Sequence, residues 1–261
     1  MRHYRDPLVP EMKIQIHRQL YRFRNAEALR FAFRQMLETV RPWMTETVSR
    51  INQTYHVGRV NQTTAEVKLA DIGKRPGLTW NEGEIGEYAL PSRAAYVAAM
   101  QVELDAELTL LTLDGIVTGL VNALTLEDRP LGVGGALEGD VRLDVLLDAA
   151  ANFVRHRSEW LTAVRDGRPL ERRQLESIEP LARSISGNAK LSSGAAASFL
   201  FDFPMPMLAV LDIIAGYDRA SCVSYALIED RIVALGHTII EHEFVAWMTQ
   251  PNTRRSQRQR L

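Results

Sequence analysis

The chain has 261 residues, of which 46% are hydrophobic and 24% charged, with 31 Lys and Arg against 32 Asp and Glu. This composition excludes an intrinsically disordered chain. The formal net charge of -1 excludes a protein that coats nucleic acid through a broad basic field. The one cysteine, Cys222, cannot form a disulfide within the chain, and the length suffices for one or two domains with a sizeable core.

Helical periodicity dominates the N-terminal half. Apolar residues recur at spacings of three and four from Asn25, and Pro42 is expected to end or kink the helix near Arg41. Residues 58–91 lose the helical period and contain several Gly and Pro. We therefore expect an irregular insertion there, either a small hairpin or a flexible arm, before a long helix that begins at Pro91.

Four more helices are predicted in the C-terminal half, because apolar residues again follow a helical period. A run rich in Ser, Gly and Ala at 184–198 is expected to connect the second helix to the last two. The predicted ranges are about 140–165, 170–185, 205–215 and 218–249. The pattern predicts an all-α helical bundle that forms one domain over 1–249, followed by a basic, disordered tail at 250–261.

No targeting or membrane segment is predicted. The N-terminal residues are charged and no apolar run follows them, unlike a secretory signal peptide. The most apolar stretch, 195–217, is interrupted by Asp202 and Asp212, so it is expected to lie in the core rather than to span a membrane. We expect a cytoplasmic protein that has no membrane partner, and no heptad repeat is long enough to predict an extended coiled coil.

The most distinctive motif lies on the predicted helix at 140–165. Asn152, His156 and Glu159 are spaced i, i+4 and i+7, which aligns them as a polar stripe beside an apolar arc, with Arg155 at its edge. A titratable imidazole, a carboxylate that orients it and a guanidinium are the groups that a shallow acid–base site needs. The alternative is a surface histidine that only pairs with Glu159 or Asn152.

Arg157 falls inside the apolar arc of the same helix. A charge at such a position must be paired, or line a cavity or interface, or else extend its stem along the surface so that its head reaches water. We favour the extended stem slightly.

The segment Asn152-x-x-Arg155-His156-x-x-Glu159-Trp160 resembles a motif of bacterial all-helical proteins that are similar, at fold level, to the HEPN group. Ribonucleases of that group use an Arg and a His that follows it by four to six residues, often composed across a dimer. The resemblance implies metal-independent RNA cleavage, with His as acid–base and Arg stabilising the phosphate. No His follows Arg155 at that spacing, whereas Arg231 and His237 fit it and are the weaker candidates.

Two functional classes therefore stay open. One is an HEPN-like protein of a bacterial stress or defence system that cleaves or binds RNA through Asn152, Arg155, His156 and Glu159. The other is a non-catalytic helical module, such as an antitoxin, immunity or adaptor protein, that binds a partner protein. No cofactor or metal is expected, because His237, Glu241 and His242 do not converge on a helix, and a homodimer is plausible for a bundle with surplus apolar surface.

Overall fold

The computed structural model describes residues 26–74, 82–124, 137, 140–216 and 223–249. Helices make up most of this described part of the chain, which confirms the all-α class. The helices are α2 (Ala26–Gly73), α3 (Glu82–Ala123), α4 (Leu143–Arg165), α5 (Arg172–Ser186), α6 (Ser193–Asp202), α7 (Pro206–Ala215) and α8 (Tyr225–Thr249). The predicted tail at 250–261 and Cys222 lie outside the described residues.

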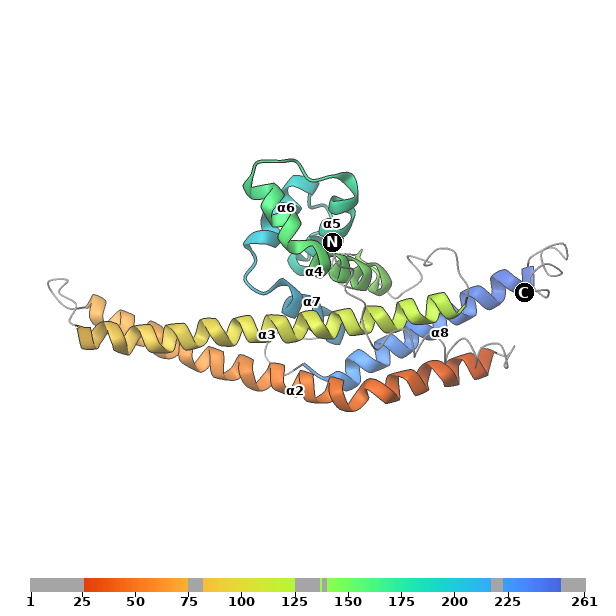
Figure 1. Cartoon of the computed structure of the whole chain (residues 1–261), viewed down its shortest axis with the longest axis horizontal. Helices are drawn as coiled ribbons and strands as arrows, with labels where there is room; N and C mark the ends of the chain where they lie inside the picture. Colours follow the sequence, from red (N-terminus) through yellow and green to blue (C-terminus); the bar gives the residue numbers. More distant parts are fainter. Residues whose placement is uncertain (1–25, 75–81, 125–136, 138–139, 217–222, 250–261) are drawn as a thin grey trace.

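α2 and α3 form a long antiparallel hairpin that runs the length of the molecule (Figure 1). We call one part of it, residues 26–54 and 101–123, together with α4–α8, the base. α8 lies along this part of the hairpin, and α4–α7 gather against one side of α3 (Figure 1). The remaining part of the hairpin, residues 55–73 and 82–100, projects beyond these helices, and we call it the arm.

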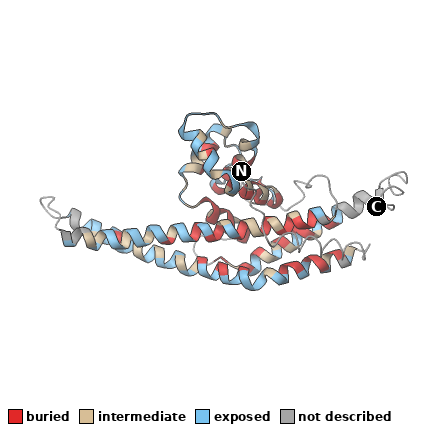
Figure 2. Ribbon diagram, viewed as in Figure 1, coloured by how far each residue is buried: buried red, intermediate tan, exposed pale blue. Residues whose placement is uncertain are grey.

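The core lies in the base, where buried side chains from all of these helices form one hydrophobic cluster. Buried residues are concentrated where α8 and α4–α7 cover the hairpin, whereas the arm is mostly exposed or half-buried (Figure 2). The largest fully buried side chains are Phe33, Phe153, Leu37, Met44, Ile51, Leu110, Leu113, Ile116, Leu120, Leu146, Leu147 and Ile178. Packing of amphipathic faces, rather than helix propensity, therefore fixes the positions of these helices.

The predicted irregular insertion at 58–91 is wrong for the described residues of that range, and 75–81 lie outside them. Residues 58–73 continue α2, and residues 82–91 begin α3. One of the glycines that suggested a loop, Gly58, instead allows the two helices to approach closely, because a Cβ there would lie 3.1 Å from the Cβ of Ala98. Tertiary packing of the hairpin has overridden the low helix propensity of this stretch.

Of the two outcomes expected at Pro42, a helix end or a kink, the helix end is wrong, because α2 continues through this residue. Leu37 and Met44, on either side of the proline, are almost fully buried, so both halves of the helix are held by the core. Arg41 adds an ion pair to Glu229 of α8, with 2.7 Å between Nη2 and Oε1. A proline costs a helix about 3 kcal/mol, which burial of these apolar side chains is large enough to offset.

The connector expected at 184–198 is partly helical, since α6 begins at Ser193. No single described helix is long and apolar enough to cross a membrane. α6 and α7 together reach that length and composition, but they are bent by 102° at the break between them. Leu200, Val210 and Ile214 of this pair are buried in the core.

Candidate functional site

The predicted polar stripe lies on the surface of α4, and its members contact their own helix. His156 Nδ1 lies 3.3 Å from Glu159 Oε2, and both side chains are about half exposed or more. The imidazole also stacks on the indole of Trp160, with 5.8 Å between ring centroids. Asn152 donates to Asp148 rather than to His156, with 3.1 Å between Nδ2 and Oδ2. The stripe therefore consists of local contacts on the surface of α4.

The two arginines of the motif point to α3. Arg155 Nη2 lies 3.0 Å from Oδ2 of Asp114, a carboxylate that is almost fully buried. Arg157 Nη1 lies 3.0 Å from Oε1 of Glu107, and its guanidinium stands 5.7 Å from the ring centre of Phe153. The expectation that Arg157 extends its side chain along the surface is wrong, because its guanidinium is paired with Glu107 across the interface between α4 and α3. Both guanidinium groups thus join α4 to α3.

Glu103, near Arg157, is a buried carboxylate of the base. Its carboxylate accepts hydrogen bonds from the backbone N–H groups of Met207 and Leu208, at 2.9 and 3.0 Å, at the start of α7. Burial raises the pKa of Glu103 to about 7, against the lowering effect of these two donors and of Arg157 at 4.0 Å. Burial also raises the pKa of Glu107. Sequence reasoning missed both carboxylates, because the local pattern predicts a helix at 205–215 but does not show that its start packs against Glu103.

Arg231 and His237 have different neighbours. Arg231 donates to the backbone carbonyl of Ile213, with 2.9 Å between Nη1 and the oxygen, at the last turn of α7. Nε2 of His237 is buried and has no hydrogen-bond partner among the described residues. Burial, followed by the nearby positive charges of Arg34 and Arg30, lowers the pKa of His237. No described hydrogen bond joins this pair within one chain, and the Arg–His site stays a prediction.

Metal ligands are not gathered in the described part of the chain. No group of three or more His, Cys, Asp or Glu side chains there is placed to hold a metal ion. The pairing of Glu241 with Arg30 instead places that carboxylate in an ion pair between α8 and α2.

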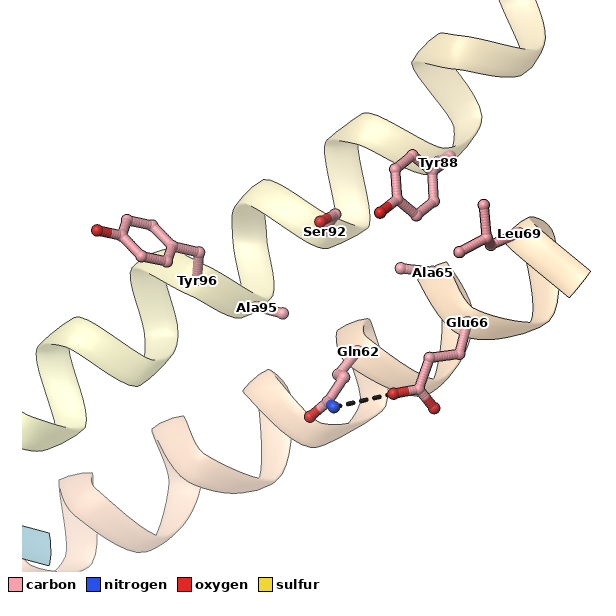
Figure 3. Close-up of a pocket in the computed structure, with 8 residues that line it drawn as sticks. All are labelled: Gln62, Ala65, Glu66, Leu69, Tyr88, Ser92, Ala95 and Tyr96. Atoms are coloured by element: carbon pink, nitrogen blue, oxygen red, sulfur yellow. Dashed lines mark hydrogen bonds between the residues drawn. The ribbon is translucent and has the colours of Figure 1, made fainter. Parts of the chain in front are cut away.

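The arm carries a feature that sequence reasoning missed. Small residues face each other between its helices, including Gly58, Ala65 and Ala98, and the two alanines are buried. A shallow groove of about 350 Å³ lies between the helices (Figure 3). Its lining residues are Gln62, Ala65, Glu66, Leu69, Tyr88, Ser92, Ala95 and Tyr96.

Tyr88 of the arm is half-buried, whereas nine other large apolar side chains of the arm are exposed. Each of them is at least 40% exposed, and Leu90 reaches 73%. They are Tyr55, Val57, Val60, Val67, Leu69, Leu90, Tyr96, Val97 and Met100. The arm thus reverses the usual distribution, with small side chains inside and large apolar ones outside. Only the spacing of Val57, Val60 and Val67 at three and seven hinted at such a surface in the sequence.

Comparison of the chain with protein-family models, with curated proteins and with solved structures gives no match. The resemblance of residues 152–160 to a motif of HEPN-like proteins therefore stays a prediction. The function has to be argued from the geometry of α4 and of the arm.

Proposed function

We propose that this chain is a non-catalytic helical protein-interaction module and that the arm is its binding element. One observation carries the proposal: the large apolar side chains of the arm face solvent, whereas its small residues fill the space between the helices. Water-exposed apolar surface is unfavourable, and a contiguous patch of it marks a contact site in soluble proteins. Antitoxin, immunity and adaptor proteins act by such binding.

Polar groups of the arm support this reading. Lys68 Nζ lies 2.9 Å from Glu87 Oε2, an ion pair that links α2 to α3 without covering the apolar side chains. Gln62 donates to Glu66 on the same helix at 2.9 Å, beside the groove (Figure 3). An apolar centre with polar groups at its edge is the usual composition of a protein–protein interface. The arm therefore combines the features that a docking surface needs.

The geometry of α4 gives less support to RNA cleavage. A catalytic His must reach the substrate beside a cation that stabilises the phosphate. Here His156 pairs with Glu159, while Arg155 is held by the buried carboxylate of Asp114. Cleavage at Asn152, Arg155, His156 and Glu159 stays a prediction that a direct assay can decide.

Site-specific photo-cross-linking in cells that express the chain tests the binding function. A photoreactive amino acid at Leu90 or Val60 is expected to give discrete cross-linked protein products. The same amino acid at Arg172, an exposed position in the base whose side chain is 91% exposed, is expected to give none. Products of equal yield at all three positions, or no product at the two arm positions, would contradict the proposal.

Incubation of the purified protein with total RNA in EDTA tests the other class. We expect no cleavage by the wild-type protein or by the His156→Ala variant. Cleavage by the wild-type protein that the variant loses would overturn the non-catalytic proposal and assign the acid–base role to His156. Cleavage that the variant retains would also overturn it, but would place the activity elsewhere.

A further inference from the structure

The solvent side of α3 carries a straight apolar stripe. Leu90, Val97, Leu104 and Leu111 are spaced by seven residues. The first three of them are 73%, 57% and 50% exposed, and Leu111 is half-buried. Leu108, 50% exposed, lies on the same side. At 100° per residue these five positions span about 60° of the helix, along about 32 Å of its length.

Nothing in the described part of the chain covers this stripe. The core-facing residues of α3, such as Val102 and Leu113, lie roughly 150° away around the helix and are buried in the hydrophobic core. Glu107 and Asp114, which bind arginines of α4, lie between the two faces. α3 is thus apolar on two sides, and only one of them is buried by the residues that the structure describes. A heptad-spaced stripe has the period that allows another α-helix to pack along it.

The charged residues beside the stripe indicate which α-helix packs along it. Arg93, Met100 and Glu107 follow one edge of the stripe, again at intervals of seven. Arg93 is exposed and makes no ion pair with any described residue, whereas Glu107 uses Oε1 for Arg157. If two copies of α3 lie antiparallel with Met100 opposite Met100, Arg93 of each copy meets Glu107 of the other. This edge is therefore complementary to itself under a two-fold rotation.

We propose that the chain forms a homodimer in which the α3 stripes of two copies pack antiparallel about a two-fold axis at Met100. The inference rests on the proposed function, since it names the first partner of the exposed apolar surface. The stripe extends from the arm into the base, so each arm would lie along the base of the other copy. The outward apolar residues of α2, Val57, Val60 and Val67, stay free for a different protein.

The molar mass of the purified protein in solution, measured across a dilution series, tests dimer formation. We expect a dimer mass that shifts to the monomer mass in Leu104→Glu, because the substitution places two carboxylates near the axis. Arg93→Glu is expected to raise the dimer dissociation constant about tenfold or more, since it opposes Glu107 of the other copy. Val60→Glu, a matched substitution at a 53% exposed residue of α2, is expected to retain the dimer.

Cysteine cross-linking in a Cys222→Ser background tests the direction of pairing. A cysteine at position 100 would meet its own copy at the axis, so Met100→Cys is expected to oxidise to a covalent dimer. A cysteine at position 90 would lie about 30 Å from its copy, so Leu90→Cys is expected to stay monomeric on denaturing gels. Covalent dimers from both variants would overturn the antiparallel arrangement in favour of a parallel one.

The two proposals fail in different ways. A monomer mass up to about 0.1 mM, or a dimer that persists unchanged in Leu104→Glu, overturns the homodimer. Cross-linked products from Val60 in cells would still support binding of another protein by the arm. Absence of both a dimer and cross-linked products would overturn both proposals.

Discussion

The base and the arm are built from the same two helices but bury opposite kinds of side chain. In the base, Phe33, Met44 and Leu113 fill the space between helices, and several further helices cover them. In the arm, Gly58 and Ala98 occupy that space, and no described helix covers the apolar residues outside. Burial of apolar area stabilises the base, whereas the arm is stable because it continues helices anchored there. Stability and binding surface are thus separated along one hairpin.

Truncation of a large apolar side chain should lower the free energy of unfolding much more in the base than in the arm. Phe153 is fully buried against Trp160 and Phe201, so Phe153→Ala is expected to lower the free energy of unfolding by about 3–5 kcal/mol. Leu90→Ala in the arm should change it by less than about 0.5 kcal/mol. Urea denaturation of both variants in a Leu104→Glu background, which removes self-association, measures the difference. Equal losses would show that the arm has a core of its own.

A glycine in the base should show how closely α8 packs on α2. A Cβ at Gly236 would lie 2.0 Å from the ring of Phe33, so Gly236→Ala forces the helices apart. We expect a loss of about 3 kcal/mol, at the upper end for overpacking a core. Gly115→Ala, on α3 with no atom within 4 Å of the added Cβ, is the control and should be neutral or stabilising. A neutral Gly236→Ala would contradict this packing.

Protonation of Glu103 should make the stability of the base depend on pH. The pKa of Glu103 is raised from 4.5 to about 7 by burial, so the folded chain binds this proton more tightly than the unfolded chain. Its contribution is fully present below pH 4.5 and is lost as the pH rises through 7. The free energy of unfolding should therefore fall by about 2.5 kcal/mol between pH 5 and 8 from this group.

The Glu103→Gln variant provides the control for that dependence, because its amide oxygen still accepts from the start of α7 but does not titrate. Denaturant unfolding at several pH values should show a flatter pH dependence for the variant than for the wild-type protein. Parallel curves would mean that Glu103 titrates normally, because the hydrogen bonds from Met207 and Leu208 offset the effect of burial on its pKa.

The smallest expected effect is a faster hydrogen exchange that is confined to the arm. Gly58→Leu would insert a side chain where the Cβ alone is 3.1 Å from Ala98, and should separate α2 from α3 near that point. Hydrogen exchange of residues 55–73 and 82–100 should accelerate, while exchange in the base stays unchanged. Gly86→Leu, also in the arm but with no atom within 4 Å of its Cβ, is the matched control. Acceleration that spreads into the base would show that the hairpin unfolds as one unit.

The sequence predicted the helical class correctly because periodicity is a local property, but it failed where packing decides. Pro42, Gly58 and Gly86 indicated breaks, yet each of them lies within a continuous helix of the anchored hairpin. The position of Arg157 in the apolar arc indicated a charge that needs a partner. Its partners lie on α3, about 50 residues earlier in the chain, and no local pattern identifies them. The contact of His156 with Glu159 followed from helical spacing. The sequence periodicity did not reveal the apolar stripe of α3, because that helix is apolar on two sides.

The continuity of α2 and α3 gives the molecule a rigid reach. Helices of 48 and 42 residues extend about 72 and 63 Å without a break among their described residues. A protein held at the outer end of the arm is therefore kept at a set distance and angle from α4–α7, rather than tethered by a flexible linker. The hairpin acts as a spacer whose length is measured in helical turns, so insertion of two residues would rotate the bound protein as well as move it.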